Sequence, residues 1–497
     1  MYIFDEEARI RGALYFHKMI FVIQDGFWKK LEYMLHPPSI AGHPRFLDFV
    51  GAWVTAVLKT VGVFDVRWLI LWTNAVFMCV AGFSIYGIGR ILYDRATGLL
   101  AVFLLFSFPF VMAQTRVFML DSPLMSMVAL TVLMLLKTRQ FSSWRYSVLL
   151  GVCAGLAQLT KETAVIFLFP LAIFYLVVSW RSGDRRRCVK NAALAFCVGV
   201  ILAGVVYFRP DNWGVLGRYL NTAWEEKSQS CWYYLLNFEN CLGLGLLLLG
   251  VPFFLMALVR CRPKGFILLF WFMVPVMIYS FFPSKALRYL LPVMPALALI
   301  LAAEMYFFMR SMVVRYVIMV VVLVAVLVQY RGYNNGVIGF TKQFQGVENS
   351  FETGRLMYQF DPKMLVVDQL YRAFKSEEGS ALSPGLVLVL FNDPKIYGSL
   401  RIRCVLDQAM MLDIICPTEM SAPAISRSPW KGRPDEILQA AYVMVKTGGE
   451  RRRLPLAVQK IEDGLKAGFD QYKDRFAPLV RVPVPDNSYV IIYKKVR

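Results

Sequence analysis

The sequence has little charge and lacks the common signatures of bound metal. Only 18% of its 497 residues are charged, whereas about a quarter of a soluble domain is. Its nine cysteines form no CxxC pair and no Cys/His cluster at zinc-ligand spacing. The low charge argues against an ordinary soluble domain, and the cysteine spacing argues against a structural zinc site.

The chain is rich in long runs of apolar residues. Hydrophobic residues make up 58% of the chain, and the mean hydropathy is +0.52. Roughly 20 apolar residues span a bilayer, and a lipid-exposed backbone must satisfy its own hydrogen bonds within helices. We predict a polytopic α-helical membrane protein of about ten spans. They are Trp68–Ile88, Gly98–Gln114, Pro123–Leu136, Tyr146–Leu159, Thr163–Trp180, Asn191–Phe208, Leu242–Val259, Gly265–Phe282, Tyr289–Phe308 and Val313–Val328.

The excess of basic residues, a net charge of +20, is concentrated in alternate short loops. Loops rich in Lys and Arg mark the cytoplasmic side of a membrane protein. The basic loops contain Arg90 and Arg95; Lys137, Arg139 and Arg145; Arg181, Arg185, Arg186, Arg187 and Lys190; Arg260, Arg262 and Lys264; Arg310 and Arg315. The other loops, the N-terminal stretch and everything after Tyr330 are therefore predicted on the outer side. No basic helix or aromatic stacking module suggests a nucleic acid partner.

Residues Phe46–Phe64 are ambiguous, because Asp48 and Lys59 interrupt an apolar run. We interpret this segment as an interfacial helix on the outer surface. The alternative, a further span, would move the N-terminus to the cytoplasmic side.

The composition changes after Tyr330. Strand-like runs at Leu386–Phe391 and Tyr489–Tyr493 alternate with amphipathic helical stretches at Met364–Phe374 and Pro455–Phe469. We therefore divide the chain into an outer loop with the Asp5-Glu6 motif and interfacial helices (1–66), a transmembrane domain (67–330) and a small outer-face α/β domain (331–497). The α/β domain has no histidine and no Gly-rich phosphate loop, which argues against a His-dependent triad or a nucleotide site there.

Cys231 with Cys241, and Cys404 with Cys416, lie in outer segments, where disulfides can form.

Two carboxylate motifs lie on the predicted outer side. A carboxylate in Asp5-Glu6-Glu7 could accept a proton from an attacking hydroxyl or amine. Asp121, before Ser122-Pro123, stands where one span ends and the next begins. It fits equally well as an N-cap of the next helix or as a second active-site carboxylate.

Cations on the outer side need a reason other than topology. Lys285 and Arg288 are three residues apart, so a helix would place them on one face. Arg binds phosphate oxygens in a fork and Lys as a point charge, which predicts a lipid-linked phosphate as their ligand; snorkelling to headgroups is the alternative. Lys161-Glu162 ends a helix with almost no loop, and a structural or phosphate-supporting role fits Lys161.

In this order, these segments resemble the GT-C superfamily, specifically the protein O-mannosyltransferases and bacterial aminoarabinose transferases. The resemblance covers essentially the whole chain. The matching segments are Asp5-Glu6, His36-Pro37-Pro38, Arg116 to Pro123, Gly151 to Lys161, and Lys285 to Pro292. It implies a GT-C-like fold in a bacterial inner membrane with an extracytoplasmic active site.

The resemblance also implies an activity, inverting transfer of a sugar from a polyprenyl-phosphate donor. Asp5, Glu6 and Asp121 would be the catalytic carboxylates. The donor phosphate would contact Lys285, Arg288 and Tyr289, with His36, Arg116 and Lys161 as further candidates. No cofactor is required, and no residue is assigned to a divalent metal. Membrane lipid is the surrounding partner, and the sequence leaves the sugar and the acceptor (lipid, glycan or protein) open. Relatives place a spanning helix before the Asp-Glu loop, whereas Met1 stands only four residues ahead of Asp5. Two explanations stay open: an apolar stretch of about 20 residues encoded upstream of Met1, or an N-terminus exported without that helix.

Two other functions remain open. A transporter or flippase of a lipid-linked sugar would favour mid-membrane charges and repeated halves. A structural membrane subunit would leave the outer charged residues without a chemical role.

Overall fold

The computed structural model describes two compact units, one formed by Ala8–Met357 and one by Tyr358–Arg497 together with Met1–Glu7. The residues described are 2–17, 20–21, 46–62, 66–115, 117–182, 184–207, 230–260, 263–282, 285–308, 317–318, 320–328, 369–370, 385–389, 412–415, 438, 442–447, 465–467, 469–483 and 489–496.

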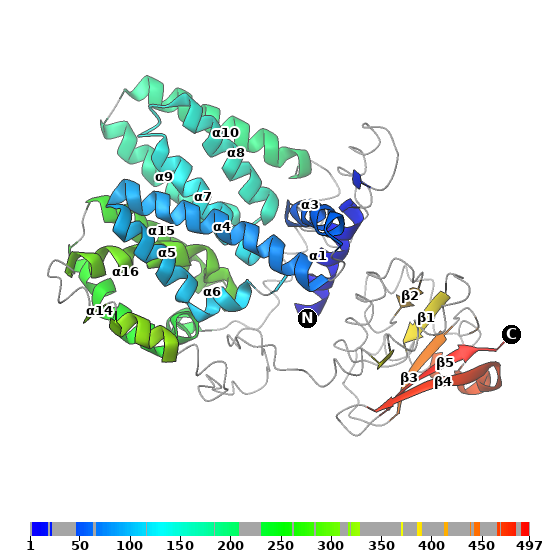
Figure 1. Ribbon diagram of the computed structural model, residues 1–497. Coiled ribbons are helices and arrows are strands. Elements are labelled where there is room, and N and C mark those ends of the chain that lie inside the picture. The colour runs from blue at the N-terminus through cyan, green and yellow to red at the C-terminus, as the bar shows by residue number, and fades with distance from the viewer. Residues whose placement is uncertain are drawn as a thin grey trace. The chain divides into compact units, whose positions relative to one another are not determined.

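The first unit is a bundle of helices (Figure 1). Helices lie at nearly every predicted span, and further helices lie before and between the spans. They are α1 (Tyr2–His17), α3 (Phe46–Thr60), α4 (Val66–Leu92), α5 (Arg95–Ser107), α6 (Pro109–Gln114), α7 (Asp121–Lys137), α8 (Trp144–Thr160), α9 (Ala164–Ser182), α10 (Arg185–Tyr207), α12 (Tyr233–Leu236), α13 (Glu239–Leu242), α14 (Leu244–Arg260), α15 (Pro263–Phe281), the 3₁₀ helix η2 (Leu287–Val293) and α16 (Met294–Phe308). Residues 317–318 and 320–328 are also helical.

Three helical stretches of the described residues are long and apolar enough to cross a membrane by themselves. They are Trp68–Leu92, Arg185–Gly204 and Leu287–Phe308, and α14 with α15 adds a fourth candidate if this pair, bent by 114°, forms one span. The number of ten spans therefore stays a prediction.

Several predicted element boundaries were wrong. The segment holding Asp5 and Glu6 is helical, in α1, and not a loop. The predicted span Gly98–Gln114 is two helices, because Phe108 is extended and Pro109 begins α6. Proline has no amide hydrogen and clashes with the preceding turn, so it starts a helix more readily than it continues one.

Helix α3 is amphipathic, as the interfacial interpretation requires. It buries Leu47 and Ala52 on one face. On another face Trp53 is half exposed and Val57 is more than half exposed. It has 15 residues, fewer than a perpendicular span needs. Its buried face packs on α1 and α4, so from Ala8 onward the predicted outer region belongs to the helical unit.

The helices give the bundle two chemically different ends. Asn74, in the third turn of α4, bonds to the backbone just before α7, and Lys137 at the end of α7 lies over Phe83 of α4. Helices α4 and α7 are therefore parallel, and α8 returns in the opposite direction. The basic loops at Arg90, Arg139 and Arg185 then share one end, and Asp121, Lys161 and η2 share the other. We refer to these as the basic end and the site end.

The second unit contains a five-stranded mixed sheet in the order β2-β1-β3-β5-β4 (Figure 1). Its strands are β1 (Gly385–Val389), β2 (Leu412–Ile415), β3 (Tyr442–Thr447), β4 (Phe476–Pro483) and β5 (Tyr489–Lys495), with the 3₁₀ turn η5 (Lys473–Arg475) before β4. Strand β1 pairs in parallel with β2 and β3, while β5 pairs antiparallel with β3 and β4. Both predicted strands are present, so a C-terminal strand-forming segment is confirmed. Of the two predicted helices only short pieces, residues 369–370 and 465–467, are among those described.

Candidate active site

The site end is organised around a buried ion pair between Asp121 and Lys161. Lys161 follows α8 in extended backbone and its Nζ lies 2.7 Å from Oδ1 of Asp121. The two side chains are 9% and 3% exposed. Asp121 is the first residue of α7, and Leu120 occupies the N-cap position. The N-cap interpretation of Asp121 was therefore wrong, because its carboxylate is bound to a cation from another helix.

The backbone before Asp121 is fixed by a residue that the sequence analysis missed. The amide nitrogen of the buried Asn74 side chain donates to the carbonyls of Thr115 and Val117, at 2.7 and 3.0 Å. The available signal was an amide inside the apolar run Trp68–Ile88, where polar side chains are costly and need partners. Asn74 thus positions the start of α7 and with it the Asp121 carboxylate.

Tyr289 brings the third predicted motif to this pair. Lys161 Nζ lies 5.4 Å from the centre of the Tyr289 ring, and the Arg288 guanidinium carbon lies 5.7 Å from it. A cation over an aromatic face is attracted by the negative face of the ring. The Tyr289 ring also stacks on Tyr279 of α15, with the ring centres 5.4 Å apart and the ring planes at 24°. Asp121, Lys161, Arg288 and Tyr289 are therefore one cluster.

Lys285 lies beside this cluster but not as predicted. It is 6% exposed, and its ammonium donates to the carbonyl of Phe282 at 2.5 Å. Ala286 is extended (φ −141°, ψ 139°) and η2 begins only at Leu287. The prediction that Lys285 and Arg288 share one helical face was wrong, since no helical turn joins them.

Tyr234, from the short helix α12, closes the cluster from another side. It is 1% exposed and lies against the backbone of Ala286, with Tyr279 and Tyr289 nearby. Burial, followed by these two phenols, raises the pKa of Tyr234 well above its ordinary value. The residue stays protonated, and its ring supports the segment that carries Lys285 and Arg288.

The structure leaves several predicted site residues unplaced. Asp5 and Glu6 lie in α1, but their side chains are outside the described residues, as are His36 and Arg116. Among the described residues no three His, Cys, Asp or Glu side chains form a group that could hold a metal ion.

The sequence left two disulfides open. Cys231 and Cys241 are both free thiols, one exposed and one buried. Cys404 and Cys416 lie outside the described residues.

Two further ion pairs stabilise the bundle away from this cluster. Arg9 of α1 and Asp48 of α3 are buried with their charged atoms 3.6 Å apart, and a Cβ on Gly12 would overlap the Asp48 carboxylate. At the basic end, Arg260 pairs with Glu304 at 3.0 Å and lies over Phe307 at 4.1 Å. Asp48 therefore contributes to the packing of α3 against α1.

Comparison with known proteins defines the fold. Residues 42–208, about a third of the chain, match the family model described as dolichyl-phosphate-mannose-protein mannosyltransferase. ArnT from Cupriavidus metallidurans in the apo state superposes with a TM-score of 0.64, over 98% of this chain and 93% of that one, at 13% identity. The same protein bound to undecaprenyl phosphate gives 0.58 over 91% and 88%, at 14% identity. The chain therefore has the fold of the GT-C superfamily of membrane glycosyltransferases.

The sequence itself is similar to that of a named bacterial glycosyltransferase. The chain is 26% identical over 239 residues to an undecaprenyl phosphate-alpha-4-amino-4-deoxy-L-arabinose arabinosyl transferase of Yersinia pestis. That match covers 44% of this chain and 42% of the relative. The chain is thus similar, over less than half the length of that relative, to an ArnT-type arabinosyl transferase, and it is a membrane protein.

Proposed function

We propose that this protein is an inverting glycosyltransferase that moves a sugar from a polyprenyl-phosphate donor to an acceptor. The observation that carries the proposal is the buried Asp121–Lys161 pair, joined through Tyr289 to Arg288 at one end of a GT-C bundle. Solved structures of this fold include one with undecaprenyl phosphate bound, which makes the same class of donor the natural candidate here.

Displacement at an anomeric carbon leaves negative charge on the departing phosphate. Lys161, Lys285 and Arg288 supply three cations at the site end, where Lys161 and Lys285 are less than 10% exposed. Charges interact more strongly in such poorly hydrated surroundings than in water. These cations would bind the donor phosphate and stabilise it as the leaving group.

The acceptor hydroxyl or amine must lose a proton as it attacks. Asp121 is the described carboxylate beside the cations, and we assign it a role in positioning or deprotonating the acceptor. Asp5, with Glu6 beside it, remains the candidate for the principal base.

We infer that the site end faces the outer side of a bacterial inner membrane. The exposed cations gather at the other end, as the distribution of Lys and Arg across membranes requires. Transfer on that side would draw on a lipid carrier and need no nucleotide.

The proposal is tested with Asp121→Asn in proteoliposomes containing labelled polyprenyl-phosphate sugars and an extract of membrane lipids. We expect release of polyprenyl phosphate to fall by roughly 10²- to 10⁴-fold, the usual contribution of a positioned acid or base. Asp94→Asn is the matched control, because Asp94 caps α5 at the basic end through the amide of Thr97, and Asn caps helices equally well.

Equal turnover of the Asp121→Asn variant and the control would remove Asp121 from the mechanism. Movement of the intact donor between leaflets, without release of polyprenyl phosphate, would favour the flippase instead.

A further inference from the structure

The connection between α7 and α8, at the basic end, has an unusual backbone. Arg139, Gln140 and Phe141 have φ values of 50°, 61° and 58°, three consecutive side-chain-bearing residues in the left-handed region. That region crowds Cβ against the carbonyl oxygen, so non-glycine residues visit it singly and rarely. A segment held in this conformation must be fixed by its surroundings.

Side chains from two other helices hold the turn. The Asn191 amide of α10 donates to the carbonyl of Phe141 at 2.6 Å, and the amide of Gln140 donates to the Tyr175 hydroxyl of α9 at 3.1 Å. Phe141 is buried with its ring 5.8 Å from that of Tyr175. The turn is therefore pinned beside the first turns of α10.

This arrangement gathers exposed cations. Arg139 and Arg145 are exposed on the turn and the start of α8, next to four exposed cations on α10. No ion pair within the described parts of the chain involves any of them, and the nearby Asp184 carboxylate accepts from the amides of Arg186 and Arg187. We call these six residues the basic patch; they are Arg139, Arg145, Arg185, Arg186, Arg187 and Lys190.

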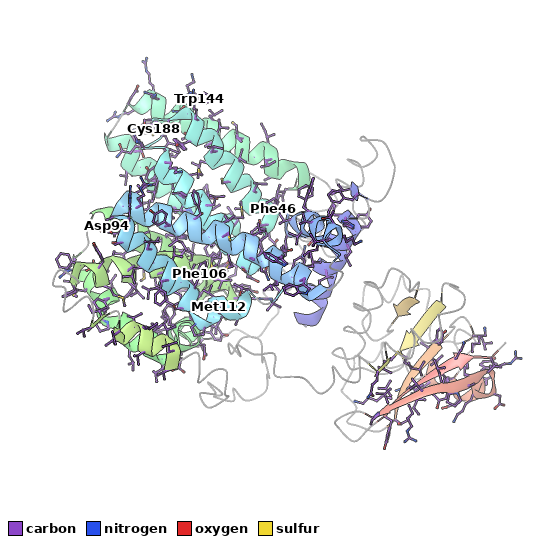
Figure 2. The ribbon with its side chains drawn as sticks, viewed as in Figure 1. Phe46, Asp94, Phe106, Met112, Trp144 and Cys188 are labelled. Atoms are coloured by element: carbon purple, nitrogen blue, oxygen red, sulfur yellow. The ribbon has the colours of Figure 1, made fainter. Side chains whose placement is uncertain are left out.

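Aromatic side chains frame the patch. Trp144 is 58% exposed and lies under the Arg145 guanidinium at 5.7 Å; Tyr146 is 38% exposed and lies 5.7 Å from Lys137. Figure 2 shows Trp144 and Cys188 at the same end of α8 and α10. Exposed Trp and Tyr are enriched where membrane proteins meet lipid headgroups.

We propose that the basic patch is a binding site for the phosphate-bearing headgroups of anionic membrane lipids. Membrane orientation requires only basic residues somewhere at this end, whereas here a strained turn is fixed by buried contacts that hold Arg139 beside α10. Clustered Lys and Arg next to membrane helices attract anionic headgroups. The inference rests on the proposed membrane orientation and not on sugar transfer, because α7, with 17 residues, places the patch about 25 Å from Asp121.

The test compares two double variants of the purified protein, titrated in detergent with phosphatidylglycerol and read by native mass spectrometry. Arg139→Gln with Arg187→Gln removes two charges from the patch. Arg90→Gln with Arg95→Gln removes two exposed charges from the same end outside the patch. We expect binding to weaken roughly fivefold for each patch cation neutralised, about 25-fold together, and to change less than about twofold in the control pair.

Arg139→Lys with Arg187→Lys should retain the binding, because the charge is kept. Equal losses in the two Gln pairs, unchanged binding in both, or equal binding of phosphatidylcholine and phosphatidylglycerol would overturn the proposal. Competition by inorganic phosphate as effective as by the lipid would likewise exclude a lipid site. Donor turnover, measured in parallel, should be unaffected by the Arg139/Arg187 pair, so that failure of one proposal leaves the other intact.

Discussion

At the scale of single residues, the pair formed by Asp121 and Lys161 stabilises the fold as well as contributing charge to the site. Both ions are almost fully buried, so their removal from water is costly and each depends on the other for compensation. A variant of either residue alone therefore loses activity for two reasons, one chemical and one structural. A double variant separates the two.

Lys161→Met should destabilise the protein by about 3–5 kcal/mol, because it leaves the Asp121 carboxylate buried without its cation. Adding Asp121→Asn removes that charge and should recover most of the loss. Thermal unfolding in detergent measures both changes, and transfer should remain low in the double variant. A double variant as unstable as Lys161→Met alone would show that the buried charge is not the cause.

At the scale of secondary structure elements, the close packing of α8 against α10 depends on small residues. A Cβ on Gly151 would lie 2.4 Å from the carbonyl oxygen of Ala195, and a Cβ on Gly199 would lie 3.2 Å from the carbonyl oxygen of Gly151. Small residues spaced four apart, Gly151 and Gly155 against Ala195 and Gly199, let helix backbones approach closely in membranes. This contact brings the N-terminal ends of the two parallel helices together.

Gly151→Ala should therefore destabilise the bundle by about 1–3 kcal/mol, because backbone atoms must move apart. Gly82→Ala in α4 is the matched control. The nearest atom to a Cβ at that position is 3.4 Å away on the Phe106 ring, an ordinary contact, so the gain in helix propensity should dominate. Opposite signs of the change in melting temperature are expected; a stabilising Gly151→Ala would contradict the packing.

At the scale of the whole helical unit, the separation of basic and site ends predicts which cysteines are accessible from outside. Cys231 is exposed and adjoins α12, whose Tyr234 lies against the cluster at the site end. Burial makes Cys241 unreactive and raises the pKa of its thiol to about 12.

A membrane-impermeant maleimide should thus label Cys231 in intact cells and leave Cys241 unlabelled, as read by peptide mapping. Cys261 lies in the basic loop between Arg260 and Arg262, which the sequence predicts on the inner side. Its peptide should become labelled only after permeabilisation. The reverse order of labelling would invert the orientation and move the site end to the cytoplasm.

The sequence by itself determined the membrane class, most helix positions and the alternation of basic loops. These depend on local composition: an apolar run must become a helix in lipid, and Lys and Arg stay on one side. Asp121, Lys161, Arg288 and Tyr289 were also identifiable, because charged and polar residues next to spans are exceptional.

Only the tertiary structure decided which of these residues meet. Asp121 and Lys161 are 40 positions apart, and their pairing depends on how α7 and α8 pack. The supporting roles of Asn74, Tyr234 and Tyr279 arise from contacts between helices distant in sequence, as does the pinning of the Arg139 turn by Asn191. Such contacts leave no pattern in the local sequence, because they form only when whole helices pack.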